Sequence, residues 1–164
     1  MLFTPLGDYY LYALLGAYPN TQIQISGDGS TNAIILGKYA YVNYSADDEN
    51  TKPILARAAS NQHLNITYLV NKGIVNGALN IQNQGNIDEG SVSVGTLINQ
   101  GCIKNAYIGI WGEKDGQISL DTFDNQALIY NPTTHAVFFE NKVSIANFTN
   151  EGVIVGGTTD TKKG

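Results

Sequence analysis

The chain contains an internal repeat, which is defined by its apolar residues and by a recurring asparagine. The segments HLNITYLVNKGIV, SVSVGTLINQGCI, QISLDTFDNQALI and KVSIANFTNEGVI align without gaps. In each segment, apolar residues stand seven, five and two positions before the asparagine and four positions after it. Near-constant periods of this kind indicate a solenoid, in which each repeat stacks on the next. The asparagines, which are 28, 26 and 25 residues apart, are Asn71, Asn99, Asn125 and Asn150.

The spacing of the apolar residues indicates strands rather than helices. Val143 and Ile145 alternate with polar neighbours, and a period of two is typical of a half-buried strand. A second apolar pair, such as Leu79 and Ile81, lies between successive asparagines, so each repeat holds at least two strands. No 3.6-residue stripe persists through the repeat, which argues against helical hairpins. The sequence therefore predicts an all-β parallel β-helix with 25 to 28 residues per coil.

The asparagines have a structural explanation in such a fold. Amide side chains stacked at the strand spacing of about 4.8 Å can hydrogen-bond to one another along the axis as a ladder. We therefore interpret the four asparagines as scaffold and not as active-site residues. A glycine follows two residues after three of them, at Gly73, Gly101 and Gly152, and we expect it to adopt a positive φ. Ala127 replaces the glycine in the third repeat, which predicts a slightly different turn there.

The chain has the length of one domain, with 164 residues. We assign residues 1–20 to an N-terminal cap and predict a short helix between Leu6 and Leu15, because a bare first coil would expose a strand edge. The polar end shows no cap, so we expect the chain to be a fragment of a longer protein. The remaining assignments are degenerate first coils at 21–60, regular coils at 61–157 and a polar tail at 158–164.

The composition limits the partners. A net charge of −5 and a pI near 4.8 argue against nucleic-acid binding, which requires basic patches, and give no support to binding of an anionic membrane surface. Cys102 is the single cysteine and takes a position that is apolar in the other repeats, so we interpret it as a packing residue. His63 and His135 lie on different coils without a carboxylate at metal-ligand spacing. We expect no metal and no cofactor.

The phrases NKGIV, NQGNI, NQGCI and NEGVI resemble the N-x-G-x-[IV] repeats of β-helical passenger domains in Gram-negative autotransporters and filamentous adhesins. The resemblance covers about residues 62–157. It implies a right-handed β-helix, an extracellular or cell-surface location and an adhesive, virulence-associated role. The implied partner is a glycan or protein on a host or neighbouring cell, with membrane attachment only through an outer-membrane anchor outside this sequence. Self-association through the terminal coils is a further expectation.

A carbohydrate-active enzyme is the alternative hypothesis, because parallel β-helices also house polysaccharide lyases and hydrolases. Acid–base cleavage of a glycosidic bond needs two carboxylates that face one groove about 5 to 9 Å apart. The candidates are Asp121 and Asp124, with Glu89 from the preceding coil. No other repeat places carboxylates in register with both aspartates, and we predict no catalytic residue as the main interpretation.

Aromatic residues are the candidate ligand-binding groups, because exposed rings can stack on sugars or anchor a protein partner. The alternative is that these rings fill the first coil and its cap. The candidates are Tyr39, Tyr41, Tyr44, Tyr107 and Trp111.

Overall fold

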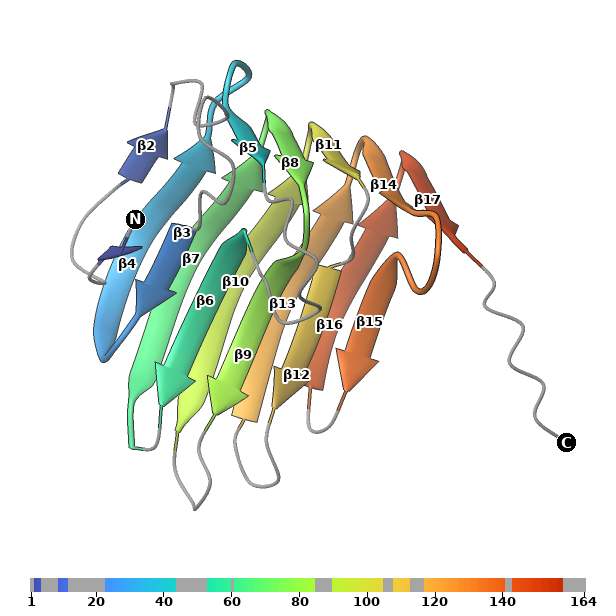
Figure 1. The fold of residues 1–164 in the computed structure, drawn as a ribbon. Helices are drawn as coiled ribbons and strands as arrows, with labels where there is room; N and C mark the ends of the chain where they lie inside the picture. Colours follow the sequence, from blue (N-terminus) through green and yellow to red (C-terminus); the bar gives the residue numbers. More distant parts are fainter. Residues whose placement is uncertain are drawn as a thin grey trace, which may run out of the picture.

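Three parallel sheets enclose one apolar core. Figure 1 shows how the strands of successive coils stack side by side. The computed structural model describes residues 2–3, 9–11, 23–43, 53–59, 61–84, 90–104, 108–112, 117–140 and 143–157. Within these ranges every regular element is a strand, and every pairing between strands is parallel. The prediction of an all-β parallel solenoid is confirmed.

The strands divide into three sheets, which we name A, B and C. Sheet A contains β1 (Leu2–Phe3), β3 (Ile23–Ser26), β6 (Ile54–Ala59), β9 (Leu79–Gln84), β12 (Ile108–Gly112) and β15 (Val137–Glu140). Sheet B contains β2 (Tyr9–Leu11), β4 (Gly29–Leu36), β7 (His63–Asn71), β10 (Ser91–Asn99), β13 (Gln117–Asn125) and β16 (Val143–Asn150). Sheet C contains β5 (Tyr41–Asn43), β8 (Ile74–Asn76), β11 (Cys102–Lys104), β14 (Leu128–Asn131) and β17 (Val153–Gly156).

The chain runs from sheet A to sheet B to sheet C and then returns to sheet A one layer further along the axis. The successive coils are β3–β4–β5, β6–β7–β8, β9–β10–β11, β12–β13–β14 and β15–β16–β17. Ile23 and Ile34, on β3 and β4, therefore belong to one coil, and each faces the apolar core.

The alternating apolar residues form columns inside the solenoid. Leu69, Leu97, Phe123 and Phe148 are in register on consecutive strands of sheet B. The first three are buried, and the Phe123 ring contacts the Phe148 ring edge-on at 5.0 Å between centroids. Each column therefore buries apolar area continuously along the axis, which is the main stabilising contribution in a fold of this kind.

The four repeat asparagines form a chain of hydrogen bonds along the axis. The Nδ2 of Asn71 donates to Asn99 Oδ1 at 2.9 Å, Asn99 Nδ2 donates to Asn125 Oδ1 at 2.8 Å, and Asn125 Nδ2 donates to Asn150 Oδ1 at 2.7 Å. The first three side chains are buried. The amides also satisfy backbone groups at the corner between sheets B and C, since Asn71 Oδ1 accepts from Gly73 N–H and Asn99 Nδ2 donates to Leu128 O. At the N-terminal end the ladder position is held by Leu36, which is in register with Asn71.

The glycines after the asparagines are explained by close packing between coils, and the expected positive φ is wrong. The described residues with positive φ are Asn61, Gly27, Gly29 and Gly77, so Gly73, Gly101, Gly152 and Ala127 are not among them. A Cβ added at Gly101 would strike the carbonyl oxygen of Gly73, and one at Gly152 would strike the carbonyl oxygen of Ala127. The chain therefore needs a small residue at this corner because the backbones of adjacent coils approach closely.

The predicted helix in the N-terminal cap is wrong at residues 9–11, which form strand β2. This strand pairs in parallel with β4, with Tyr9 beside Ile34 and Leu11 beside Leu36. The physical reason is that the edge of β4 presents unpaired backbone N–H and C=O groups, and a strand hydrogen-bonds to them whereas a helix does not. The rest of the predicted helix lies outside the described residues.

Truncation of the buried Phe123 ring tests how much the apolar column of sheet B contributes to stability. We expect Phe123→Ala to lower the free energy of unfolding by about 3–5 kcal/mol, because this side chain is fully buried between neighbours on the adjacent coils. Phe148→Ala is the control in the same column, and it should cost clearly less because that ring is 49% exposed. Urea denaturation of both variants makes the comparison, and equal losses would contradict the assigned register.

The ladder can be tested by replacing one amide with an apolar side chain of similar size. Asn99→Leu removes two donated hydrogen bonds and leaves Asn71 Nδ2 without its acceptor, so we expect a loss of about 2–4 kcal/mol from unsatisfied buried groups. Asn65→Leu is the matched control, because Asn65 is exposed on the outer face of β7. An equal loss of stability in both variants would show that the asparagine ladder does not stabilise the fold more than an exposed asparagine does.

Candidate functional site

The outer face of sheet B is polar along most of its length. One column across five strands contains small polar side chains, and within it Ser93 Oγ and Ser119 Oγ are hydrogen-bonded at 2.9 Å. Beside it, His63 Nδ1 and Ser91 Oγ are 2.8 Å apart. The column of small polar residues is Ser30, Asn65, Ser93, Ser119 and Ser144. This face therefore presents hydroxyl and amide groups at the regular spacing of the coils.

The centre of this face lacks a side chain at Gly95. Thr67, Gly95 and Asp121 hold the same position on β7, β10 and β13, between residues that are paired in register. A Cβ at Gly95 would lie 2.7 Å from the Thr67 carbonyl oxygen, so the backbone approach requires glycine. Tyr68, which follows Thr67, is 46% exposed, and Asp121 is exposed on the other side of Gly95. The exposed side chains of Tyr68 and Asp121 thus belong to the two strands that flank Gly95, which is half-buried and has no side chain.

The three acidic residues of the enzyme hypothesis differ in their surroundings. Asp124 is held by two hydrogen bonds, since its Oδ1 accepts from Thr149 Oγ1 at 2.8 Å and its Oδ2 accepts from Gln126 Nε2 at 2.5 Å. Asp121 lies on the same strand and is exposed, and its backbone oxygen accepts from Asn147. Glu89 lies outside the described residues. The described residues thus provide one free carboxylate and one that is already engaged, and the third partner stays a prediction.

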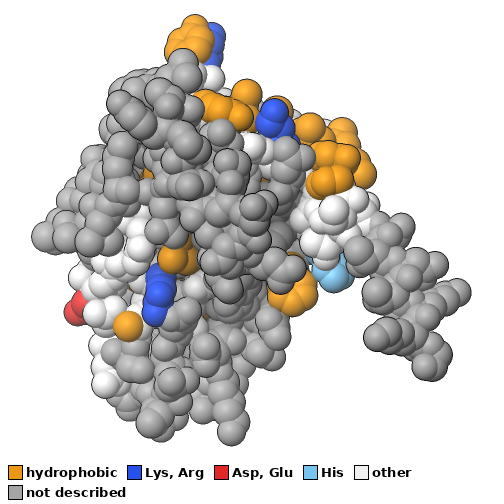
Figure 2. All heavy atoms as spheres, in the orientation of Figure 1, with side chains coloured by type: hydrophobic (Ala, Val, Ile, Leu, Met, Phe, Trp, Pro, Cys, Tyr) orange, Lys and Arg blue, Asp and Glu red, His pale blue; other side chains and the backbone are white. Residues whose placement is uncertain are grey.

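The outer face of sheet C is apolar. Its first column contains Tyr41, Ile74, Cys102, Leu128 and Val153, in register on five consecutive strands. Ile74 is 38% exposed and Val153 54% exposed, and the other three are half-buried. The second column adds Tyr130 and Val155, both exposed, next to Lys104. Figure 2 shows apolar side chains gathered along this face, which lies at the top of the view.

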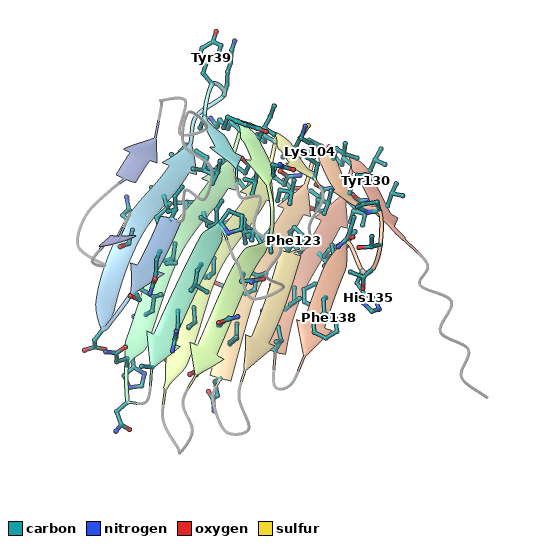
Figure 3. All side chains as sticks on the ribbon, in the orientation of Figure 1. Tyr39, Lys104, Phe123, Tyr130, His135 and Phe138 are labelled. Carbon is teal, nitrogen blue, oxygen red and sulfur yellow. The ribbon has the colours of Figure 1, made fainter. Side chains whose placement is uncertain are left out.

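The aromatic candidates from the sequence fall in different places. Tyr39 is 72% exposed in the turn before β5 and lies under the Lys38 ammonium, which is 5.0 Å from the ring centroid. Figure 3 shows Tyr39 projecting away from the body of the solenoid. Tyr41 is on sheet C, and Trp111 is on β12 of sheet A. Tyr44 and Tyr107 lie outside the described residues. The candidates that the structure describes, Tyr39, Tyr41 and Trp111, therefore lie in three different elements of the fold.

Within the described ranges, no group of three or more His, Cys, Asp or Glu side chains is placed to hold a metal ion. Cys102 is free and half-buried on the outer face of sheet C, next to Ile74 and Leu128. A search of the same ranges for a helix that is long and apolar enough to cross a membrane finds none.

The last coil leaves part of the core uncovered. Phe139 and Phe148 are 42% and 49% exposed, whereas Ile110 and Phe123, which precede them in their columns, are fully buried. Strands β15, β16 and β17 are the outermost strands of their sheets. Asn150, the last member of the ladder, is exposed. This end is the terminal-coil surface through which self-association was expected.

Tyr68 and the apolar face of sheet C were missed by the sequence analysis, although the alternation contains a signal for both. Val75, Ile103 and Ile129 point into the core, so their immediate neighbours in sequence must point outward. Those neighbours include apolar residues in every coil, which marks an apolar outer face. The outward direction of Tyr68 follows from a local departure from alternation, since Ile66 and Leu69 are both buried and the two residues between them are exposed.

Comparisons with protein-family models, with curated proteins and with solved structures gave no match to this chain.

Proposed function

We propose that the protein is a surface-displayed recognition scaffold that binds a cell-surface glycan on the outer face of sheet B. The observation that carries this proposal is the arrangement around Gly95, where the exposed side chains of Tyr68 and Asp121 belong to the two strands that flank this half-buried glycine. An aromatic ring can stack on the apolar face of a sugar, and a carboxylate accepts hydrogen bonds from sugar hydroxyls. The neighbouring serine and threonine hydroxyls act as both donors and acceptors, which suits a ligand with many hydroxyl groups.

The biological setting follows from the resemblance of the N-x-G-x-[IV] phrases to autotransporter passengers and filamentous adhesins. We propose a secreted or cell-surface location in a bacterium, with an adhesive and virulence-associated role. A right-handed coil is part of this proposal, since crossovers between parallel strands of one sheet are right-handed in about 98% of cases. The columns of buried apolar residues support a stiff rod that holds the glycan-binding face away from its attachment point.

The carbohydrate-active enzyme is the second candidate, and Asp121 is the residue that connects it with the proposed binding face. Its carboxylate is exposed, while Asp124, three residues later, is engaged by Thr149 and Gln126. Cleavage requires a second free acid at the right distance. The binding proposal needs only the groups that the face presents, and it is therefore the simpler one.

A glycan array of the purified chain, run beside a reducing-end release assay on the same sugars, tests both candidates. We expect binding without release. Tyr68→Ala should weaken binding of the strongest ligand by about tenfold or more, because loss of an aromatic anchor typically costs 2 kcal/mol or more at an interface. Asp121→Asn should weaken it less, since an amide keeps one acceptor.

Tyr39→Ala is the matched control, because Tyr39 is equally aromatic and more exposed but lies in the turn before β5. It should leave binding unchanged. Binding that is lost in the Tyr39 variant and kept in the Tyr68 variant would place the site elsewhere. Release of reducing ends that depends on Asp121 would replace the adhesin with the enzyme.

A further inference from the structure

We infer that the outer face of sheet C is the interface of a two-fold symmetric dimer, formed with a second copy of this chain whose solenoid axis runs in the opposite direction. The face is a set of short parallel columns on β8, β11, β14 and β17. Contiguous exposed apolar surface on a soluble protein marks an interaction site. The order of the residues along these columns indicates that the partner covering this face is a second copy of the chain.

At the corner between sheets B and C lies a column of side chains whose charge changes from positive to negative along the solenoid axis. It consists of the residues that directly follow the ladder asparagines, namely Lys72, Gln100, Gln126 and Glu151. All four are exposed, and Gln100 Nε2 donates to Gln126 Oε1 at 2.9 Å, which shows that the side chains stack along the axis. The positive charge stands at the N-terminal end and the negative charge at the C-terminal end. Among the described residues, neither Lys72 nor Glu151 has an ion-pair partner.

A column with a positive charge at one end and a negative charge at the other is electrostatically complementary to a second copy of itself that runs in the opposite direction. If a two-fold axis runs parallel to the strands of sheet C and midway between β11 and β14, β8 of one copy lies over β17 of the other. Lys72 then meets Glu151 of the second copy at both ends of the column, and Gln100 meets Gln126. An interface of this kind is isologous and closes on itself, so it yields a dimer and not a filament.

The same operation also matches the other two columns. In the apolar column, Ile74 comes to lie over Val153 of the second copy, and Cys102 lies over Leu128. In the second column of sheet C, which contains Lys104 and Tyr130, Lys104 comes to lie over the Tyr130 ring of the second copy. An ammonium group and an aromatic face attract each other. Figure 3 shows Lys104 and Tyr130 on this face of the solenoid. Strands of the two faces run in the same direction in this arrangement, which suits aligned packing of sheets.

A dimer whose two-fold axis runs along the solenoid axis does not pair these charges. This axis would place each coil over the same coil of the second copy. It would also place the corner column over the column of Lys104 and Tyr130. Lys72 would then lie over Asn76 and Glu151 over Val155, so the charged groups would lose water without gaining a partner. The order of charges therefore selects the antiparallel dimer.

Sedimentation equilibrium of the full chain over a wide concentration range, at low and at moderate salt, tests the inference. We expect a monomer–dimer equilibrium that weakens as salt rises, because the end pairs are exposed. Glu151→Lys should raise the dissociation constant by about tenfold, since it places like charges opposite each other twice in the dimer. Lys72→Glu should have the same effect, and the variant that carries both changes should dimerise like the unchanged protein.

Lys38→Glu is the matched control, because it makes the same charge change on an exposed lysine in the coil of β5, outside the four paired coils. It should leave the equilibrium unchanged. Leu128→Lys, at the centre of the face, should abolish the dimer while circular dichroism shows the native strand content. A monomer at every concentration would overturn the inference.

A dimer that survives Leu128→Lys would also overturn it, and would place self-association at the exposed last coil. Failure of the double charge swap to restore the dimer would reject the antiparallel arrangement. The test needs no glycan, and Tyr68→Ala should not alter the equilibrium, so its outcome is separate from that of the glycan-binding proposal.

Discussion

The parallel register of successive coils is the constraint on which the rest of the structure depends. Because each strand pairs in parallel with its equivalent one coil away, every side chain stands beside side chains in the same position of the neighbouring coils. A residue type that suits one coil is therefore selected again in the next. Apolar residues become columns of core, asparagines become a hydrogen-bonded ladder, and a close backbone contact becomes a column of small residues at Gly73, Gly101 and Gly152.

The same register explains how much could be predicted from the sequence. The solenoid and its strands were predictable, because the apolar residues before Asn71 and its equivalents repeat locally at fixed distances. The role of the glycines was not, because the carbonyl of Gly73 that excludes a Cβ at Gly101 belongs to another coil. Strand β2 was missed for a related reason. Its pairing is specified by the free backbone edge of β4, and no repeat marks it.

The outer faces are under weaker constraint than the core, and this is where the candidate sites lie. A core column tolerates little change, since it must fill a fixed cross-section. Outward positions need only be compatible with a strand, so sheet B can present serine, threonine and asparagine while sheet C presents isoleucine, valine and tyrosine. The candidate site could be predicted only in part from the sequence. Asp121 stands out by residue type, whereas the outward direction of Tyr68, on the strand next to Gly95, depends on two adjacent residues of β7 both turning outward.

The two proposals have a joint geometric consequence. The column from Lys72 to Glu151 lies at the corner where sheet B ends and sheet C begins. In the proposed dimer these corner columns meet, so the two faces of sheet B lie on the same side of the assembly. A glycan chain or a dense glycan layer could then engage both faces at once, and the second contact would be intramolecular, which raises avidity without any new contact. Weak single sites of the kind proposed for Tyr68 and Asp121 would suffice for adhesion under this arrangement.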